Sequence, residues 1–486
     1  MNRLPPVWFQ CVFALCALLV VPRGQAAAVG AEPGRLNIIA IVTDDQARWS
    51  VGAYGNPDVQ TPQLDRLARE GAKFTNAFVA TPVCSPSRAE FFTGLYGTQV
   101  GITDYLNRPE ESAGMGLPDS AITWPAVLQQ HGYATALIGK WHLGTLPQFH
   151  PTRHGFDHFF GWLLTPQSID PVLEVEGATR QLRGSLPDLM VDEALRYVAA
   201  KREHPFAMVI TFLAPHHPYG PVLEVDSAPY KNLDLQVPSF PGLNVDYVKE
   251  ETRKYYGSVH SVDRNLGRLL DGLDKLDLSR RTIIWFTSDH GYMIGHHGLQ
   301  HKGNATSIAG GVEGPRRPNM FDDSLRVPLL IRWPGVTKPG MVIDGTVSNV
   351  DTFATILGML GVPAPANAKP NGLDFSPVLR GGAFPRRDAL FGQYDLHNGG
   401  LAYMRMIRTD DWKLVRFYRA NMQDELFDLR KDPGELTNRY GETSVGGVRQ
   451  ELQKKLETWM RSIDDPLLRD PGYDTSLNQR PPAEKN

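Results

Sequence analysis

Residues 36–45 read Leu36-Asn37-Ile38-Ile39-Ala40-Ile41-Val42-Thr43-Asp44-Asp45. The first seven form a short, nearly continuous apolar run, which is typical of a strand buried on both faces of a parallel sheet. The run stops abruptly at a threonine and two aspartates. We therefore predict a buried strand that delivers Asp44 and Asp45 to one edge of a sheet.

Three further segments repeat this design. Each is an apolar run followed by charged or imidazole side chains: Tyr133–Ile138 before Gly139-Lys140-Trp141-His142, Phe206–Leu213 before Pro215-His216-His217-Pro218, and Thr282–Thr287 before Ser288-Asp289-His290-Gly291. Helical patterns lie between them, at residues 61–70, 124–130, 189–200 and 255–273. This alternation predicts an α/β fold with a large, mostly parallel sheet flanked by helices. In such sheets ligands bind at the carboxyl ends of the strands, where the four motifs would meet.

The acidic residues at this edge predict a metal site. Asp44, Asp45 and Asp289 carry hard oxygen ligands suited to Ca²⁺ or Mg²⁺, and His290 is a candidate fourth ligand. Each acidic pair alone is more often a strand-end turn or a helix cap than a metal site. Three carboxylates at one edge would repel one another unless a cation lay among them, so the whole set favours a divalent cation.

Basic and imidazole side chains follow the same strands. A lysine there can neutralise an anionic oxygen, and a histidine can carry a proton. The candidates are Lys140, His142, His216, His217 and Lys302. Taken singly, each is more often a solvated lysine or a loop histidine.

The composition limits the possible functions. The chain has 486 residues, of which 42% are hydrophobic and 21% are charged, as in an ordinary globular protein. Its formal net charge of -3 and the lack of any lysine- or arginine-rich run exclude a typical nucleic-acid-binding protein.

The N-terminus resembles a secretory signal peptide. Arg3 precedes an apolar run over residues 7–21, and Ala26-Ala27-Ala28 is a small-residue cleavage pattern. The run is shorter than the ~20 residues that a membrane-spanning helix needs. We expect residues 1–28 to be removed, giving an exported protein, periplasmic or secreted, with no stable membrane insertion.

One cysteine remains after this leader. Cys11 and Cys16 lie within the leader, so Cys84 has no partner for an internal disulfide. Such a thiol indicates intermolecular pairing, a reactive group or a buried residue without a role. Pro86 suits the first position of a helix that continues through residues 89–96, which would place residue 84 at a positive helix N-terminus with Arg88 one turn on. That position suits an anion.

These motifs together resemble a known family. Cys84-Ser85-Pro86-Ser87-Arg88 followed by Thr93-Gly94 is similar to the signature of type I sulfatases in the alkaline phosphatase superfamily. Further matching pieces occur along the chain: Asp44-Asp45, Gly139-Lys140-Trp141-His142-Leu143-Gly144, Gly155-Phe156-Asp157, Ala214-Pro215-His216, Ser288-Asp289-His290-Gly291, Arg326-Val327-Pro328, Arg332-Trp333-Pro334-Gly335 and Glu425-Leu426-Phe427-Asp428-Leu429. The resemblance extends from residue 36 to about residue 460.

The resemblance implies a covalent mechanism. In this family a maturation enzyme oxidises the cysteine to formylglycine (3-oxoalanine), here at Cys84. One hydroxyl of the hydrated aldehyde attacks sulfur to give a covalent sulfoenzyme, and the other expels sulfate by elimination. The implied metal ligands are Asp44, Asp45, residue 84, Asp289 and His290, with Ca²⁺ as the expected ion and Mg²⁺ as the alternative.

The resemblance also assigns the remaining catalytic roles. Arg88 would hold the hydrated aldehyde, and Lys140 and Lys302 would bind sulfate oxygens. His142 is the expected base, and His216 is the expected acid for the departing alcohol, with Lys302 as the alternative. A phosphonate or phosphate-ester hydrolase and a non-catalytic binding protein are the alternatives. The expected substrate is a sulfated carbohydrate or a sulfated small molecule.

The chain divides into four predicted parts. After the leader we expect a catalytic domain at residues 34–370, a smaller C-terminal α+β subdomain at 385–463 and an irregular tail at 464–486. The subdomain contains predicted strands at 402–408, 412–418 and 425–429 and a helix at 448–463. Residues 301–319 form a long connection that would suit a substrate-shaping lid. His397, Asn398, Arg408 and residues 413–419 border the pocket in one interpretation and form a solvated strand face in the other.

Overall fold

The main sheet has ten strands and is mostly parallel. The computed structural model describes residue 1 and residues 35–163, 165–310, 313–418 and 422–469. The strand order is β13 (Met341–Ser348), β2 (Ala72–Phe78), β12 (Leu329–Arg332), β8 (Thr282–Ser288), β1 (Asn37–Thr43), β7 (Phe206–Thr211), β3 (Ala134–Lys140), β4 (His158–Trp162), β5 (Val172–Val175) and β6 (Ala178–Gln181). The predicted α/β class is confirmed, and the four predicted strands are neighbours in the order β8, β1, β7 and β3.

The sheet is mixed at both sides of this parallel centre. β12 pairs antiparallel with both β8 and β2, and β5 and β6 add an antiparallel hairpin beyond β4. The sequence analysis identified none of these outer strands. β2 alternates between buried and half-buried residues, and β6 is exposed throughout, so neither is a continuous apolar run.

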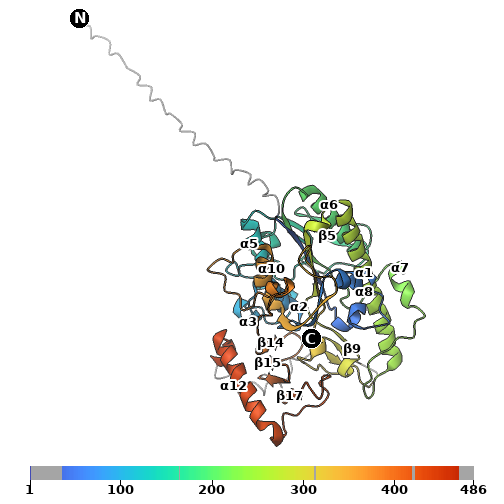
Figure 1. Ribbon diagram of the computed structural model, residues 1–486, viewed down its shortest axis with the longest axis vertical. Helices are drawn as coiled ribbons and strands as arrows, with labels where there is room; N and C mark the ends of the chain where they lie inside the picture. The colour runs from blue at the N-terminus through green and yellow to red at the C-terminus, as the bar shows by residue number, and fades with distance from the viewer. Residues whose placement is uncertain (2–34, 164, 311–312, 419–421, 470–486) are drawn as a thin grey trace.

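Helices cover both faces of the sheet (Figure 1). One hydrophobic cluster joins Ile38, Ala40 and Val42 of β1 to α2 (Cys84–Thr93), α5 (Trp124–Gln130) and α10 (Thr352–Leu360). The opposite cluster joins Ile39 and Ile41 to α1 (Pro62–Glu70), α6 (Leu186–Lys201) and α8 (Val245–Lys275). The described residues also contain the short helices α3 (Gly97–Val100), α4 (Arg108–Ser112), α7 (Glu224–Ser227), α9 (Asp322–Leu325) and α11 (Ser376–Leu379). The alternation along β1 therefore sends successive side chains into two separate cores.

Helix α2 differs from the prediction at both ends. It begins at Cys84, two residues before Pro86, because the amide of Ser87 already donates to the carbonyl of Val83. It ends at Thr93, because Gly94 adopts a left-handed conformation with φ of 68°. The predicted extension to residue 96 is wrong, while the position of residue 84 at a helix N-terminus is confirmed.

Two smaller sheets lie near the carboxyl edge of the main one. β9 (Met293–Ile294), β10 (Leu299–His301) and β11 (Thr306–Ser307) form a three-stranded sheet, in which only His301 and β11 belong to the segment 301–319 that was expected to form a lid. The C-terminal sheet contains β14 (Leu390–Leu396), β15 (Ala402–Arg408), β16 (Trp412–Phe417) and β17 (Glu425–Asp428). Helix α12 (Gly446–Ser462) packs on it, and Figure 1 shows the pair below the main sheet.

The first residues of the predicted irregular tail are ordered. Asp465 accepts a hydrogen bond from the amide of Leu467 and so caps a short 3-10 helix at Pro466–Leu468. Residues 470–486 and the predicted leader lie outside the described residues, apart from Met1. Within the described part of the chain, every helix is too short or too polar to cross a lipid bilayer.

Candidate active site

The ends of the central strands bring the predicted site residues together. Asp44 and Asp45 follow β1, Asp289 and His290 follow β8, and Lys140 is the last residue of β3. Helix α2 points its N-terminus at the same edge, and Sγ of Cys84 lies 3.4 Å from Oδ1 of Asp44. The same sulfur lies 3.4 Å from Nε2 of His290 and 3.3 Å from Nζ of Lys302.

Each carboxylate of the site has a basic partner. Nζ of Lys140 lies 2.5 Å from Asp44, Nζ of Lys302 lies 2.5 Å from Asp45, and Nη2 of Arg88 lies 2.9 Å from Asp289. All six side chains are buried. The three positive side chains relieve the repulsion between the three carboxylates, so repulsion alone does not require a cation here.

The donor set nevertheless fits a cation. Nδ1 of His290 lies 2.9 Å from the carbonyl oxygen of Gly291 and therefore carries a proton, which leaves the lone pair of Nε2 free in the neutral ring. Nε2 lies 3.3 Å from both Asp45 and Asp289. One ligand atom each from Asp44, Cys84, Asp289 and His290 lies within 4.8 Å of the others. Carboxylate oxygens in this arrangement suit Ca²⁺ or Mg²⁺.

Burial and charge act in opposite directions on these groups. Burial raises the pKa of Asp289 to about 6, and the neighbouring Asp44 adds to the shift. Burial alone would also raise the pKa of Asp44, but Lys140, His216 and Arg88 hold it well below its usual value. Burial alone would likewise raise the pKa of Cys84, but Lys140, Lys302 and His290 hold it well below the ordinary thiol value. Cys84 is therefore a buried group that favours the anionic form.

A hydrogen-bond network fixes the start of α2 against β8. The hydroxyl of Ser87 donates to the carbonyl oxygen of Asp289. Nδ2 of Asn349 donates to Ser87 and to the carboxyl of Glu90, and the hydroxyl of Thr81 donates to the other oxygen of Glu90. Ser87 was part of the quoted motif, whereas Glu90 and Asn349 carried no signal that the sequence analysis used. The network holds residue 84 in a fixed position at the site.

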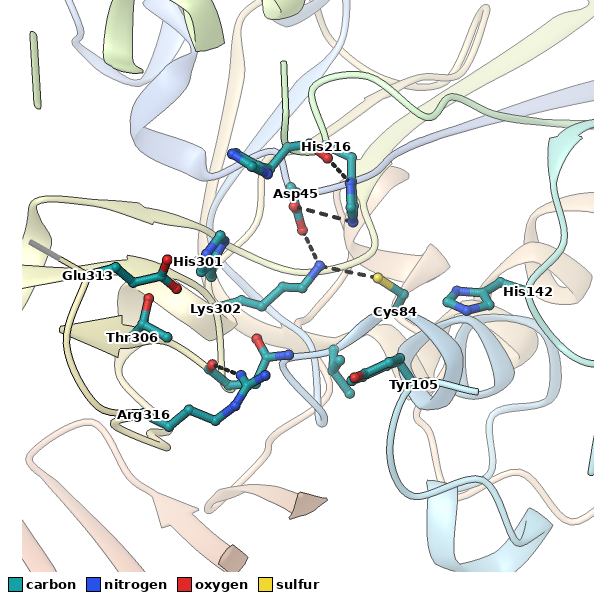
Figure 2. Close-up of a pocket in the computed structure, with 13 residues that line it drawn as sticks. Asp45, Cys84, Tyr105, His142, His216, His301, Lys302, Thr306, Glu313 and Arg316 are labelled. Carbon is teal, nitrogen blue, oxygen red and sulfur yellow. Dashed lines mark hydrogen bonds and ion pairs between the residues drawn. The ribbon is translucent and has the colours of Figure 1, made fainter. Parts of the chain in front are cut away.

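Cys84 lies at the base of an open cavity of about 260 Å³ (Figure 2). The cavity is lined by Asp45, Val83, Cys84, Tyr105, His142, His216, His217, His301, Lys302, Asn304, Thr306, Glu313 and Arg316. Of the predicted catalytic residues, Cys84, His142, His216 and Lys302 reach this cavity. Arg88 and Lys140 lie behind it, on the buried carboxylates.

Two of the lining histidines have opposite properties. Nε2 of His142 lies 3.0 Å from the carbonyl oxygen of Leu106 and so carries its proton, which leaves an unpartnered, buried Nδ1. Burial, with Lys140, lowers the pKa of His142. Burial alone would also lower the pKa of His216, but Asp45 and Asp44 outweigh it and raise the value.

Further lining residues were not identified from the sequence. Tyr105, His301, Asn304, Thr306, Glu313 and Arg316 all come from loops or short strands, where no periodic pattern marks them. His301 ends a hydrogen-bonded chain that begins with the amide of Gln300, passes through Tyr219 and reaches Tyr292. The amide of Gln300 donates to Tyr219, and the hydroxyl of Tyr292 lies 3.0 Å from Nδ1 of His301, which leaves Nε2 on the side of the ring away from Tyr292.

Four residues that were considered as a pocket border have other partners. Arg408 and Lys413 both bind the carboxylate of Asp322, and Lys413 is 0% exposed. Neither lines the cavity nor forms a solvated strand face. His397 pairs with Glu110, and Nδ2 of Asn398 donates to the carbonyl oxygen of Tyr105. Asn398 thus supports a lining residue without lining the cavity itself.

A nucleophile surrounded by basic groups and metal-type ligands, at the carboxyl edge of an α/β sheet, is typical of hydrolases that cleave anionic esters. Comparison with known families specifies the class. Residues 36–362 match the family described as Sulfatase, and residues 316–462 match N-sulphoglucosamine sulphohydrolase, C-terminal. The chain belongs to the sulfatase family and is a sulfuric ester hydrolase.

Several characterised sulfatases are similar to this chain. An ulvan-active sulfatase from Formosa agariphila is 30% identical, over 89% of this chain and 83% of that protein. An N-acetylglucosamine-6-O-sulfatase from Bacteroides thetaiotaomicron is 28% identical, over 89% and 88%. A steryl-sulfatase from Mus musculus is 28% identical, over 90% and 83%. These relatives span both carbohydrate and steroid sulfatases.

Solved structures share the fold. One, a complex with its substrate D-glucosamine-2-N,6-O-disulfate, has a TM-score of 0.78 and 26% identity, and the match covers 89% of this chain and 99% of that one. The phosphonate monoester hydrolase of Agrobacterium radiobacter has a TM-score of 0.67 and 23% identity, covering 88% and 96%. The second likeness concerns the fold alone.

Proposed function

We propose that this chain removes sulfate from a sulfated carbohydrate, with residue 84 acting as formylglycine and with Ca²⁺ bound beside it. The observation that carries the proposal is the position of Cys84, at the base of a cavity and in contact with Lys302, Asp44 and His290. Asp44, Asp45, Asp289 and His290 would hold the cation together with residue 84. Mg²⁺ is the alternative ion, because the same oxygen ligands accept it.

The formylglycine side chain and the divalent cation would supply the central chemistry. When formed and hydrated, formylglycine supplies one hydroxyl to attack sulfur and a second that permits release of sulfate. When bound, the cation supplies positive charge that favours deprotonation of a hydroxyl and polarises the ester. A divalent cation would also leave the balanced set of three acidic and three basic side chains with net positive charge, which attracts an anionic sulfate ester.

The two histidines suit opposite proton transfers. A base needs a free lone pair at neutral pH, and His142 has a lowered pKa and an unpartnered Nδ1 next to residue 84. An acid needs a bound proton, and the raised pKa of His216 favours one. We assign His142 to the hydroxyl of residue 84 and His216 to the departing alcohol, since groups with pKa values shifted apart commonly divide these roles.

The basic residues would position the sulfate. Lys302 reaches the cavity and contacts Sγ of Cys84, so its ammonium group can also donate to a sulfate oxygen there. Lys140 forms an ion pair with Asp44, so its positive charge would act on the sulfate from the buried side of the site. Arg88, bound to Asp289 and to the carbonyl oxygen of Lys140, would hold residue 84 and screen charge.

The first experiment tests the nucleophile. The full chain is produced with and without a formylglycine-generating enzyme, and mass spectrometry measures the mass of the peptide that contains residue 84. Aryl sulfate turnover should require the aldehyde. Cys84→Ala should be inactive, and Cys84→Ser should give at most one burst without turnover, since serine has no second hydroxyl. Turnover by Cys84→Ala, or faster cleavage of an aryl phosphate than of the sulfate, would overturn the proposal.

The second experiment tests the cation. Removal of divalent ions with a chelator should abolish aryl sulfate turnover and lower the melting temperature of the matured enzyme. Added Ca²⁺ should restore both, and Mg²⁺ is compared in parallel. Asp289→Asn should weaken the restoration, whereas Asp271→Asn, on exposed α8 surface, should not. Full activity after exhaustive chelation would contradict the metal site.

We also propose export through residues 1–28. Expression of the full chain in a Gram-negative host should give a processed protein in the periplasm or medium, and deletion of residues 2–28 should retain it in the cytoplasm. Cytoplasmic accumulation of the full chain would contradict this assignment.

A further inference from the structure

We propose that Arg316 binds a second acidic group of the substrate, so that the preferred substrate is a saccharide with a carboxylate or sulfate beside the sulfate that is cleaved. This inference deepens the proposed function and rests on it. Arg316 lines the same cavity as Cys84 and Lys302, and Figure 2 shows it on the wall away from His142.

The charge of Arg316 is the basis of the inference. Lys302, Lys140 and Arg88 each bind a buried carboxylate. Among the described residues, no carboxylate oxygen lies within 4.0 Å of Arg316, and Glu313 on the same cavity forms no ion pair with it. The guanidinium has a neutral hydrogen-bond partner: Nη1 lies 2.7 Å from the carbonyl oxygen of Asn304. Most donors of the planar guanidinium are therefore free for a carboxylate or a sulfate.

The backbone holds Arg316 close to Lys302. Residues 303–306 and 316–319 run antiparallel, with Thr306 facing Arg316 and the amide of Asn319 donating to Gly303. Asn304, which binds the guanidinium, is two residues from Lys302, at most about 7 Å along the chain. The neighbouring Arg317 turns away and pairs with Glu425 of the C-terminal sheet. Of these two arginines, Arg316 lines the cavity and Arg317 does not.

A loop of the C-terminal sheet packs against the guanidinium of Arg316. The loop after β14 contains Gly399 and Gly400, and a Cβ on Gly399 would lie 2.7 Å from Nη2 of Arg316. Gly399 also has a φ of 72°, which favours glycine. Arg316 is exposed, and its guanidinium lies against this loop while Nη1 is bound to the carbonyl oxygen of Asn304. A positioned, unpaired cation loses less entropy when it binds an anion.

Binding to a turnover-blocked protein tests the proposal. Calorimetry with Cys84→Ser compares three ligands: N-acetylglucosamine 6-O-sulfate, D-glucosamine-2-N,6-O-disulfate, and the first sugar joined to glucuronic acid. At least one of the two ligands with a second acidic group should bind about tenfold more tightly than the first, roughly the strength of one charge-assisted contact. The tighter ligand shows whether the second group is sulfate or carboxylate.

Arg316→Gln in the same background should reduce that preference to about one. Arg316→Lys should retain part of it, because the charge remains while the planar fork is lost. Arg386→Gln, on an exposed arginine that pairs with Asp388, is the matched control and should retain the full preference. Equal affinity for the three ligands, a preference that survives Arg316→Gln, or no binding of any of them would overturn the proposal. Failure of sulfatase activity itself would appear separately, as absent aryl sulfate turnover by the matured enzyme.

Discussion

Hydrogen bonds decide which nitrogen each active-site histidine presents. Nε2 of His142 donates to the carbonyl oxygen of Leu106, which leaves its Nδ1 toward residue 84. Nδ1 of His290 donates to the carbonyl oxygen of Gly291, which leaves its Nε2 toward Asp45, Asp289 and Cys84. Nδ1 of His301 is occupied by the hydroxyl of Tyr292. Single partners thus set which nitrogen of each ring faces the site.

The role of Tyr292 is testable. Tyr292→Phe removes the hydroxyl that binds Nδ1 of His301, so the ring loses the hydrogen bond that orients it. We expect the KM for a sulfated saccharide to rise about fivefold, the effect of one lost neutral hydrogen bond, with little change in kcat. Tyr256→Phe is the control, because that hydroxyl binds Asn56 and has no link to His301. Equal KM values for wild type and Tyr292→Phe would contradict a role for His301 in binding.

At the scale of elements, helix α2 combines two functions. Its N-terminus presents residue 84, and the rest of the helix is buried, with Phe91 and Phe92 in the core between α5 and the sheet. Glu90 is the charged exception in its second half. Burial raises the pKa of Glu90 to about 7, although Thr81 and Asn349 donate to it. The helix is therefore held partly by a carboxyl group that prefers to be protonated.

This carboxyl group makes stability depend on pH. Its pKa is higher in the folded chain than in the unfolded one, so the folded state holds the extra proton between about pH 4.5 and 7. Stability should therefore fall as the pH rises through this window and level off above it. Glu90→Gln removes the titrating group and keeps one of its two accepting oxygens. The difference between its melting temperature and that of the wild type should therefore shift in favour of the variant as the pH rises from 5 to 7.

Glu70→Gln serves as the comparison for Glu90. Burial alone would raise the pKa of Glu70, but hydrogen bonds from Arg66 and Arg332 lower it, so any effect belongs below pH 4.5. Thermal melts of the three proteins at pH 5, 6, 7 and 8 provide the measurement. A constant difference between wild type and Glu90→Gln across this range would show that Glu90 does not titrate there.

The sequence predicted the parts of the fold that rest on local pattern. β1, β3, β7 and β8 are continuous apolar runs because both of their faces are buried, and the metal-type ligands were found because they follow those runs. The half-buried β2 and the exposed β6 carry no such pattern. Arg316 and Tyr105 reach the cavity only through the packing of loops that are distant in sequence. Nor could a pattern pair Lys413 with Asp322, 91 residues away.

At the scale of the whole molecule, buried ion pairs connect strands of the C-terminal sheet to one another and to helix α9. Arg405 on β15 lies between Asp395 and Asp465, with 2.5 Å to an oxygen of each. Lys413 on β16 binds Asp322 and Glu435. Because such charges are out of water, removal of one partner is more harmful than loss of a surface pair.

Asp465→Ala tests this dependence. It should lower the free energy of unfolding by about 3 kcal/mol, because half of the compensation for the buried guanidinium is lost. Glu451→Ala removes an exposed pair with Lys455 on α12 and should change it by no more than about 0.5 kcal/mol. Urea unfolding followed by tryptophan fluorescence measures both. Similar losses of unfolding free energy for the two variants would mean that the buried Arg405–Asp465 pair contributes no more than an exposed pair.

The burial of residue 84 has a consequence for the order of events in the cell. Cys84 is 3% exposed and begins a helix in which every residue is buried. If residue 84 is oxidised as we propose, an enzyme that has to enclose this thiol would have to act before the segment folds. The yield of modified protein would then depend on the relative rates of modification and folding. The quantity of folded protein alone would in that case say little about the quantity of the formylglycine form.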